Sequence, residues 1–560
     1  MTRPARPRAD RESSGNLSLL CGQRCPRRNY HPELLGWYIY GQGSVSADRA
    51  RIVPNPGVQI YELTGAMVGV PSLGPSSGNC EAEGCAEKAG DPVDLGTGLF
   101  IYDKTDLVLP DTIPIALTRT YRQNDSRSRA FGIGTTHNYD IFLVGDTTTY
   151  NYQELVTASG GRIRFDRTSP GIGFTTAVYR NNSVPGIWYK ARISWNGVGW
   201  TLSRRDGTVL TFPDSFSVTT PQKAALLSVT DRNGNVLELD RDSGGDLTRI
   251  TSPNGRWIQF TYDGSHRVTE ARDNMGRTVQ YTYTSGRLTD VTDAAGGTWE
   301  YAYDTSGRMT AITDARSILY LENEYDASGR VSLQTLADDG TWEFDYTTAL
   351  NGGITRTDVT DPRGHVRRVT FGSMPVAPGG FMSGSFPATV TQALGTALER
   401  TMSVTREPGT NLLLGATDPP GRTTAYTYDS LGNVTSVTRL AGTQDAVTTT
   451  YTYDGKYSNV TGITDPLGHT TRFEYDLKGN RTAVTDPLGN RSSFSYNTAG
   501  QMVTATDANG HTTSFGYSGG HLVSVTDPLG RTTTRIVDAA GPRSPRSVLR
   551  GRPRFRSTTP

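Results

Sequence analysis

Along the C-terminal half of this chain, apolar and polar residues alternate in short runs that predict β-strands with one buried face. In one such run, Val279, Tyr281 and Tyr283 alternate with threonine and glutamine. A period of two residues, with aromatic and β-branched side chains, is typical of a strand. A shorter apolar run follows, in which Leu288 and Val291 stand three residues apart. Because that spacing breaks strict alternation, it predicts a β-bulge or a twist in the second strand of each pair.

The turns between these strands predict β-hairpins. A turn such as Asp304-Thr305-Ser306-Gly307 begins with Asp and has Gly three residues later. Asp in the first position accepts hydrogen bonds from the backbone ahead of it, and Gly supplies the positive φ that closes the hairpin. The link to the next hairpin is Asp-Pro-Leu-Gly in the best copies, which is the signature of a type I turn. These links open at Asp465, Asp486 and Asp527.

The hairpins recur every 20 to 21 residues, which indicates an array of repeats. A lone hairpin is marginal in water, so neighbouring units must pair edge to edge and bury their aromatic faces together. We therefore expect an all-β fold in which the hairpins form a long, curled antiparallel sheet that stays open at its end. The first run of repeats is expected over residues 226–371 and the second over residues 416–534, with an irregular interruption at residues 372–415.

The phrase Tyr-Asp-x-x-Gly-Arg resembles the YD repeats of the bacterial RHS proteins, relatives of the teneurin shell. We assign a structural role to the residues of this signature and of the linking turns. They are Tyr303, Asp304, Gly307, Arg308, Tyr325, Asp326, Gly329, Arg330, Tyr428, Asp429, Gly432, Tyr475, Asp476, Gly479, Asp465, Asp486 and Asp527.

A second resemblance lies upstream of the repeats. The stretch GDPVDLGTG at residues 90–98, followed by Arg119-Thr120-Tyr121 and His137, is similar to the domain of unknown function that precedes the repeats in many RHS proteins. We therefore expect a smaller β-rich domain over residues 89–225.

In the RHS family the repeats form a hollow β-shell that commonly encloses a C-terminal toxin, which an aspartate-dependent self-cleavage releases. The cleavage motif Asp-Pro-x-Gly-Leu does not occur in this sequence, although five Asp-Pro-x-Gly runs are present. The resemblance implies a non-enzymatic scaffold, a fragment or truncated form of a bacterial shell protein of the contact-dependent toxin type, without the toxin and the cleavage segment. The alternative is a carbohydrate-binding surface protein built on the same repeat sheet.

The composition fits a thin sheet with many turns, since 35% of the residues are hydrophobic and 63 are glycine. The net charge of +1 is unevenly spread, because residues 1–30 and 535–560 are both strongly basic. No nucleic-acid-binding motif accompanies these basic ends, so we do not expect nucleic-acid binding. Proline, glycine and arginine dominate residues 1–88 and 535–560, and we expect both ends to be weakly ordered.

The sequence contains no recognised catalytic constellation, since it has no P-loop and no His-Glu-x-x-His motif. We therefore expect no enzyme activity, no cofactor and no catalytic, cofactor-binding or metal-binding residue. The cysteines are Cys21, Cys25, Cys80 and Cys85, for which zinc binding, disulfides and free thiols remain alternatives.

No stretch of the sequence is apolar enough for a signal peptide or a membrane span. The resemblance implies a place at the bacterial cell surface or in the secreted fraction, with an unknown protein or saccharide as the partner. The open sheet predicts self-association through its C-terminal edge around Ser514–Arg531, because an unpaired strand edge is a template for pairing with another chain.

Overall fold

The structure is a computed structural model that describes residues 87–146, 148–158, 160–214, 224–350, 352–372, 386–534, 537–538 and 541–542. The described residues form strands and turns and contain no α-helix, which confirms the expected all-β fold. The four cysteines and most residues of the two basic ends lie outside the described ranges. The predictions for those residues stay predictions.

Small sheets open the described part of the chain. β3 and β4 form a long hairpin that β7 extends to a three-stranded sheet, and β1 pairs with β2. β5 pairs with β6, which joins the main sheet where Gly132 faces Arg287 of β21. The bounds are β1 (Lys88–Ala89), β2 (Val93–Asp94), β3 (Ile101–Leu109), β4 (Ile115–Arg122), β5 (Ser128–Arg129), β6 (Gly132–Ile133) and β7 (Thr135–His137).

The main sheet is an antiparallel ladder in chain order, in which each strand from β8 to β42 pairs with the next. With β5 and β6 it contains 37 strands. Its first part consists of β8 (Phe142–Gly145), β9 (Tyr152–Val156), β10 (Arg162–Arg167), β11 (Val178–Arg180), β12 (Arg192–Trp195), β13 (Gly199–Ser203), β14 (Val209–Pro213), β15 (Ser228–Thr230), β16 (Val236–Arg241), β17 (Leu247–Thr251), β18 (Trp257–Tyr262), β19 (Val268–Asp273), β20 (Thr278–Thr284), β21 (Arg287–Thr292), β22 (Thr298–Tyr303), β23 (Met309–Thr313), β24 (Leu319–Tyr325), β25 (Val331–Leu336), β26 (Thr341–Thr348), β27 (Ile354–Thr360) and β28 (Val366–Phe371).

The ladder continues beyond β28. Its remaining strands are β29 (Pro387–Gln392), β30 (Arg400–Arg406), β31 (Leu413–Thr417), β32 (Thr423–Tyr428), β33 (Val434–Arg439), β34 (Val447–Tyr453), β35 (Val460–Thr464), β36 (Thr470–Tyr475), β37 (Arg481–Thr485), β38 (Arg491–Tyr496), β39 (Met502–Thr506), β40 (Thr512–Ser518), β41 (His521–Thr526) and β42 (Thr532–Thr534). A separate pair, β43 (Val537–Asp538) and β44 (Gly541–Pro542), follows. β29 to β31 stand inside the stretch expected to be irregular, and residues 373–385 of that stretch lie outside the described ranges.

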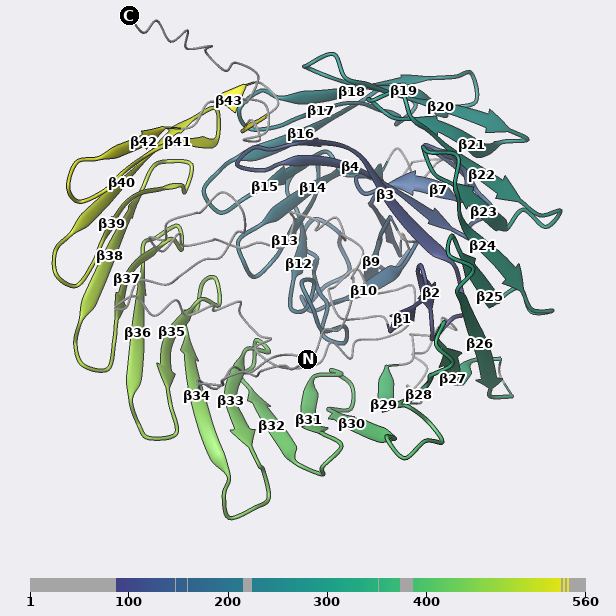
Figure 1. Cartoon of the computed structure of the whole chain (residues 1–560). Coiled ribbons are helices and arrows are strands. Elements are labelled where there is room, and N and C mark those ends of the chain that lie inside the picture. Colours follow the sequence, from purple (N-terminus) through teal and green to yellow (C-terminus); the bar gives the residue numbers. More distant parts are fainter. Residues whose placement is uncertain are drawn as a thin grey trace, which may run out of the picture. The chain divides into compact units, whose positions relative to one another are not determined.

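Figure 1 shows these strands in chain order along a curve, as the sequence predicts. Within the described residues β42 pairs only with β41, so the sheet does not close. The predicted open, curled antiparallel sheet is therefore confirmed.

The predicted bulge is present in the second strand of the repeats. In the β20–β21 pair, Thr282 faces Asp290 and Tyr283 faces Leu288, so Thr289 is the extra residue. The insertion turns Leu288 and Val291 to the same buried face, although they are three residues apart. The same shift of register recurs in the pairs that carry the other YD motifs, for example β24–β25 and β36–β37.

The tyrosine of the YD motif stands opposite the bulge and ties each hairpin to the one before it. The hydroxyl of Tyr303 donates to the Leu288 carbonyl oxygen at 2.8 Å, and Tyr475 donates to Val460 at 2.7 Å. The other tyrosines that donate to a carbonyl of the preceding hairpin are Tyr262, Tyr283, Tyr325, Tyr346, Tyr428, Tyr453 and Tyr496. We call these bonds the tyrosine ladder.

Removal of one hydroxyl from the ladder is expected to be costly. Tyr303→Phe leaves the Leu288 carbonyl without its side-chain donor, and should lower the free energy of unfolding by about 1–3 kcal/mol. Tyr320→Phe is the matched control, because the Tyr320 hydroxyl bonds no described residue; a change within about 0.5 kcal/mol is expected. Urea unfolding followed by circular dichroism measures both. Equal losses in the two variants would contradict the role of the ladder.

Candidate functional site

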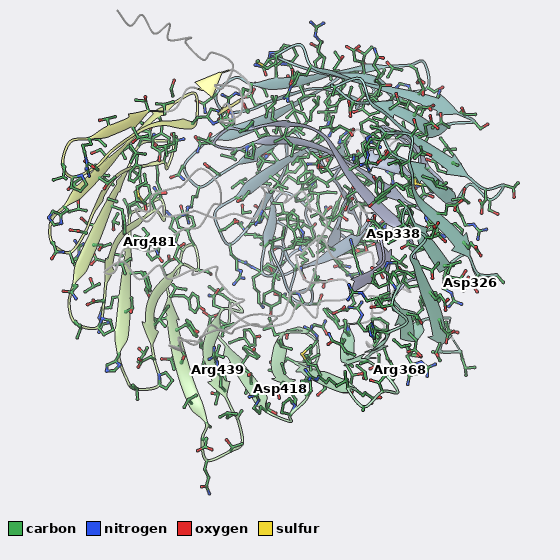
Figure 2. All side chains as sticks on the ribbon, in the orientation of Figure 1. Asp326, Asp338, Arg368, Asp418, Arg439 and Arg481 are labelled. Carbon is green, nitrogen blue, oxygen red and sulfur yellow. The ribbon has the colours of Figure 1, made fainter. Side chains whose placement is uncertain are left out.

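The turns hold the signature residues as the sequence suggests. Asp304 accepts hydrogen bonds from the Arg308 amide at 2.8 Å and from its side chain at 2.7 Å. Although burial opposes ionisation, these bonds lower the pKa of Asp304. Gly307 has a φ of +78°, the left-handed conformation that the turn requires. Asp326 lies at an equivalent turn and Asp418 at a linking turn (Figure 2), and each pairs in the same way with the arginine four residues later.

The N-terminal strands dock on the aromatic face of the first run of repeats, which we call the inner face. Arg119 of β4 forms an ion pair with Asp106 of β3 at 2.6 Å, and both side chains are 3% exposed. The Tyr281 hydroxyl donates to Asp106 at 2.8 Å, and Arg119 donates to the Tyr301 hydroxyl at 3.3 Å. Burial raises the pKa of Tyr281 and of Tyr301, which keeps both hydroxyls protonated. The buried pair therefore joins β3 and β4 to strands β20 and β22.

Backbone groups of the bulged strands complete this docking. The amide of Val331 donates to the Gly98 carbonyl at 2.9 Å, and the amide of Val268 donates to the Ala130 carbonyl at 2.8 Å. The carbonyls of these same two residues accept bonds from the tyrosine ladder. Residues next to the bulges thus bond the tyrosine ladder on one side and the N-terminal segment on the other.

The second run of repeats differs from the first in how far its inner face is covered. Tyr281 and Tyr301 of the first run are 3% and 4% exposed beneath the N-terminal strands. At equivalent positions of the second run, Tyr426 and Phe473 are buried, but Tyr451, Phe494 and Phe515 are only half-buried. Within the described residues, no strand of the β1–β7 region pairs or packs over these three side chains.

Turns of the second run meet two earlier turns, one before the first run and one at its start, in a contact that we call the seam. Arg205, in the β13–β14 turn, donates to the Leu431 carbonyl and to Asn433 at 2.8 Å each. In the β15–β16 turn, Asn233 accepts from Asn480 at 3.1 Å. Asn235 of the same turn donates to the Ala499 carbonyl at 3.0 Å. The partners are more than 220 residues apart in the chain, so the seam holds the curl of the sheet.

The seam predicts an asymmetry between two glycines of one repeat. Gly432 and Gly421 stand at opposite ends of β32 with φ of +78° and +85°. A Cβ on Gly432 would overlap the buried ring of Tyr189, whereas a Cβ on Gly421 would meet nothing within 4 Å. Both alanine variants should lose about 1–2 kcal/mol through the left-handed backbone. Gly432→Ala should lose about 1–3 kcal/mol more through overpacking, measured as urea-unfolding midpoints. Equal midpoints would argue against the seam.

Sequence reasoning found the turn residues but missed the residues of the seam. Arg205, Asn233 and Asn235 belong to no repeat signature. The one available signal is the turn Asp231-Arg232-Asn233-Gly234, which carries Arg-Asn where the best copies carry Pro-Leu. Asn233 is 9% exposed in the seam, whereas Leu488 in an Asp-Pro-Leu-Gly turn is 88% exposed.

The described residues contain neither a cluster of metal-ligating side chains nor a membrane-spanning helix. No group of three or more His, Cys, Asp or Glu side chains among them is placed to hold a metal ion. No helix in the described part of the chain has the length and apolarity needed to cross a membrane. His469 and His511 lie exposed beside the carboxylates of Asp465 and Asp507 at the turns.

Profiles of known protein families match three parts of the chain. The RHS repeat profile matches residues 409–444, 458–491 and 496–532, and the teneurin YD-shell profile matches residues 215–317. A domain of unknown function (DUF6531) matches residues 90–165. The chain belongs to the RHS/YD-repeat family. The two resemblances seen in the sequence are thereby confirmed.

Two solved structures illustrate what this RHS-repeat chain is similar to. The Tc holotoxin pore of Photorhabdus luminescens is 13% identical, with a TM-score of 0.41 over 77% of this chain and 22% of that one. The complex of TcdB2 and TccC3 with Cdc42 is 12% identical, with a TM-score of 0.36 over 78% of this chain and 27% of that one. The RHS-repeat chain thus spans about a quarter of the length of these structures. No curated protein matches it.

Proposed function

We propose that this RHS-repeat chain is a non-enzymatic scaffold of a bacterial surface or secreted shell, whose second run of repeats holds an apolar stretch of another polypeptide against its inner face. The observation that carries the proposal is the difference between the two runs. The N-terminal strands bury Tyr281 and Tyr301, whereas Tyr451, Phe494 and Phe515 stay half-buried. Partly exposed aromatic side chains on one face of the sheet favour a protein contact. Membership of a family of repeat shells supports it.

The test compares two triple variants. Tyr451, Phe494 and Phe515 are replaced together by serine on the inner face, and the exposed turn residues Leu467, Leu488 and Leu529 are replaced by serine as the matched control. The probe is reduced, carboxymethylated α-lactalbumin, an unfolded polypeptide, together with a dye that fluoresces on apolar surfaces. We expect the inner-face variant to lose most of the dye signal and of the polypeptide binding, and the turn variant to keep both. Equal losses, or no binding by the unchanged chain, would overturn the proposal.

A saccharide site is the second candidate function, because one cavity combines aromatic rings with hydrogen-bonding charges. The cavity of about 540 Å³ lies beneath β3 and is lined by Trp299, Tyr320, Asp293 and Lys104, among others. Lys104 Nζ lies 3.4 Å from the centre of the Trp299 ring, and one oxygen of Asp293 caps the turn amides while the other bonds no described residue. A glycan array with the unchanged chain and Trp299→Ala tests it. A saccharide that binds both proteins equally would exclude this cavity.

We also propose that the free edge at β42 mediates self-association. Thr532–Thr534 pairs only with β41 in the described chain and offers backbone donors and acceptors to a further strand. Light scattering should show a molar mass that rises with concentration. Thr533→Lys should keep the chain monomeric, since a charge on an edge strand opposes pairing. A mass independent of concentration in the unchanged chain would rule this out.

A further inference from the structure

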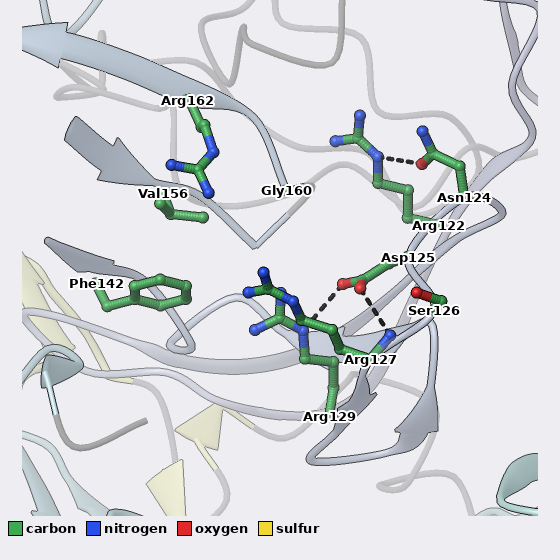
Figure 3. A pocket seen from close by; sticks show the side chains of 10 residues that line it. All are labelled: Arg122, Asn124, Asp125, Ser126, Arg127, Arg129, Phe142, Val156, Gly160 and Arg162. Carbon is green, nitrogen blue, oxygen red and sulfur yellow. Dashed lines mark hydrogen bonds and ion pairs between the residues drawn. The ribbon is translucent and has the colours of Figure 1, made fainter. Parts of the chain in front are cut away.

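A small cavity outside the inner face and the seam gathers an unusual number of positive charges. Its volume is about 270 Å³, and it lies between the end of β4, the loop at residues 123–127, β5 and strands β8 to β10. Four arginines line it together with Asp125 and Phe142 (Figure 3); these arginines are Arg122, Arg127, Arg129 and Arg162. Asp125 is the one carboxylate in its lining, so positive charge dominates.

The guanidinium groups are held in place by neighbours. Arg129 Nε donates to Asp125 at 2.9 Å, and Arg122 Nε donates to Asn124 at 2.8 Å. Arg162 donates to Glu154 at 2.7 Å. These bonds orient the guanidinium groups, each of which carries five N–H donors.

Arg127 differs from the other three arginines. Its backbone amide donates to Asp125 at 3.1 Å, but its side chain is exposed and forms no hydrogen bond or ion pair with a described residue. Figure 3 shows its guanidinium beside that of Arg129, facing the space toward which Arg162 extends. Like charges so placed repel one another, and an anion between them relieves the repulsion.

Phe142 and Val156 form the apolar part of the cavity wall, which also contains Asn124 and Ser126. Phe142 is 2% exposed, Val156 is 4% exposed, and the Arg129 guanidinium carbon lies 5.8 Å from the centre of the Phe142 ring. Gly160 has a φ of +75°, and a Cβ there would meet Arg122 Nη1 at 2.9 Å. The absence of a side chain at residue 160 thus leaves room for the Arg122 guanidinium. Burial lowers the pKa of Arg122, because the charged guanidinium loses part of its hydration. A bound anion would stabilise this charge.

We propose that this cavity binds a phosphate-type oxyanion, with the apolar group that carries it lying against Phe142 and Val156. The planar guanidinium fork matches the oxygens of phosphate and sulfate in two parallel hydrogen bonds. The volume lies just below the range of about 300–1,000 Å³ that drug-sized ligands occupy, so it suits an anion with a small attached group.

Binding is measured by isothermal titration calorimetry on the full chain at constant ionic strength, with inorganic phosphate and with phenyl phosphate as probes. We expect one saturable site that binds phenyl phosphate more tightly than inorganic phosphate, because the ring gains the apolar wall. Tighter binding of inorganic phosphate would assign the site to the free ion and overturn the part of the proposal that concerns the attached group. The absence of saturable binding of either probe at millimolar concentration would overturn the whole proposal.

Substitutions of single arginines test whether the anion binds in this cavity. Arg127→Gln and Arg162→Gln should each weaken binding about tenfold or more, since each removes a charge-assisted bond. Arg162→Lys keeps the charge without the fork and should weaken binding less than Arg162→Gln. Arg164→Gln is the matched control, since Arg164 lies two residues further along the same face of β10, pairs with Asp166 at 2.8 Å and does not line the cavity. Circular dichroism confirms folding of each variant. An equal loss in Arg164→Gln, or full competition by chloride, would show a diffuse charge effect and overturn the site.

Discussion

Replacing Arg119 with methionine is expected to lower the free energy of unfolding by about 3–5 kcal/mol, the usual cost of leaving one partner of a buried ion pair without the other. Asp106 would keep its bond from the Tyr281 hydroxyl but lose its cation, while remaining buried at 3% exposure. Arg119 also bonds Tyr301 of the repeat sheet. The loss should therefore appear first as opening of β3 and β4 from the inner face.

Hydrogen exchange of β3 and β4, together with urea unfolding, measures this opening. The double variant Arg119→Met with Asp106→Leu should regain most of the stability, because an apolar pair removes the uncompensated charge. Arg164→Met is the control, since its pair with Asp166 is exposed and surface pairs contribute about 0–1 kcal/mol. If Arg119→Met cost no more than Arg164→Met, the buried pair would not hold the N-terminal strands in place.

The second large effect concerns the pH dependence of stability, to which two buried groups make opposite contributions that nearly cancel. Burial lowers the pKa of His137 from 6.5 to about 4, which the nearby Asp140 opposes and Arg241 reinforces. Burial raises the pKa of Asp94 from 3.8 to about 6, against the hydrogen bonds from Thr97 and Gly96 and the charge of Lys88. His137 and Asp94 are both about 2% exposed.

The two shifts act with opposite signs over the same window. As pH falls from 6.5 to 4, the unfolded chain protonates His137 before the folded chain does, so folding loses about 3 kcal/mol. Asp94 has a folded pKa above its unfolded value, so the folded chain takes up the proton first. Folding then gains about 3 kcal/mol as pH falls from 6 to 4. The unchanged chain should therefore show a nearly flat contribution from these two groups.

Single variants separate the contributions of His137 and Asp94 to the pH dependence of stability. His137→Gln should become more stable by about 3 kcal/mol as pH falls from 6.5 to 4, since only the Asp94 effect remains. Asp94→Asn keeps an oxygen for the turn amides and should become less stable by about 3 kcal/mol over that range. Urea unfolding at several pH values gives the slope of the free energy of unfolding against pH. A loss of stability that is the same at every pH does not affect this slope. Parallel slopes in both variants would refute the opposed shifts.

The sequence predicts the local parts of this fold because they depend on neighbours in the chain. The alternation of Tyr281 and Tyr283 fixes a strand, the three-residue spacing of Leu288 and Val291 fixes a bulge, and Gly307 fixes a turn. Each is decided within one repeat. The outcome for these elements was therefore readable from the period of about 20 residues alone.

The docking surfaces were not predictable in the same way. Asn233 meets Asn480 across 247 residues of sequence, and no local pattern marks either residue as a partner of the other. The ion pair of Arg119 and Asp106 is another example, because the side chains alone do not reveal that Tyr281, 162 residues further along, closes over it. The way in which the curl brings distant strands together decides these contacts.

The most direct test of the curl is a cross-link across the seam. Asn235 and Ala499, whose side-chain amide and carbonyl oxygen lie 3.0 Å apart, are replaced by cysteine in a chain whose native cysteines are serine. In dilute solution a short bis-maleimide should link residues 235 and 499 within one chain. It should fail to link residue 235 to a cysteine at Asn490, in the turn at the other end of β38. Equal linking of both pairs, or linking only between chains, would contradict a sheet that curls back on itself through the seam.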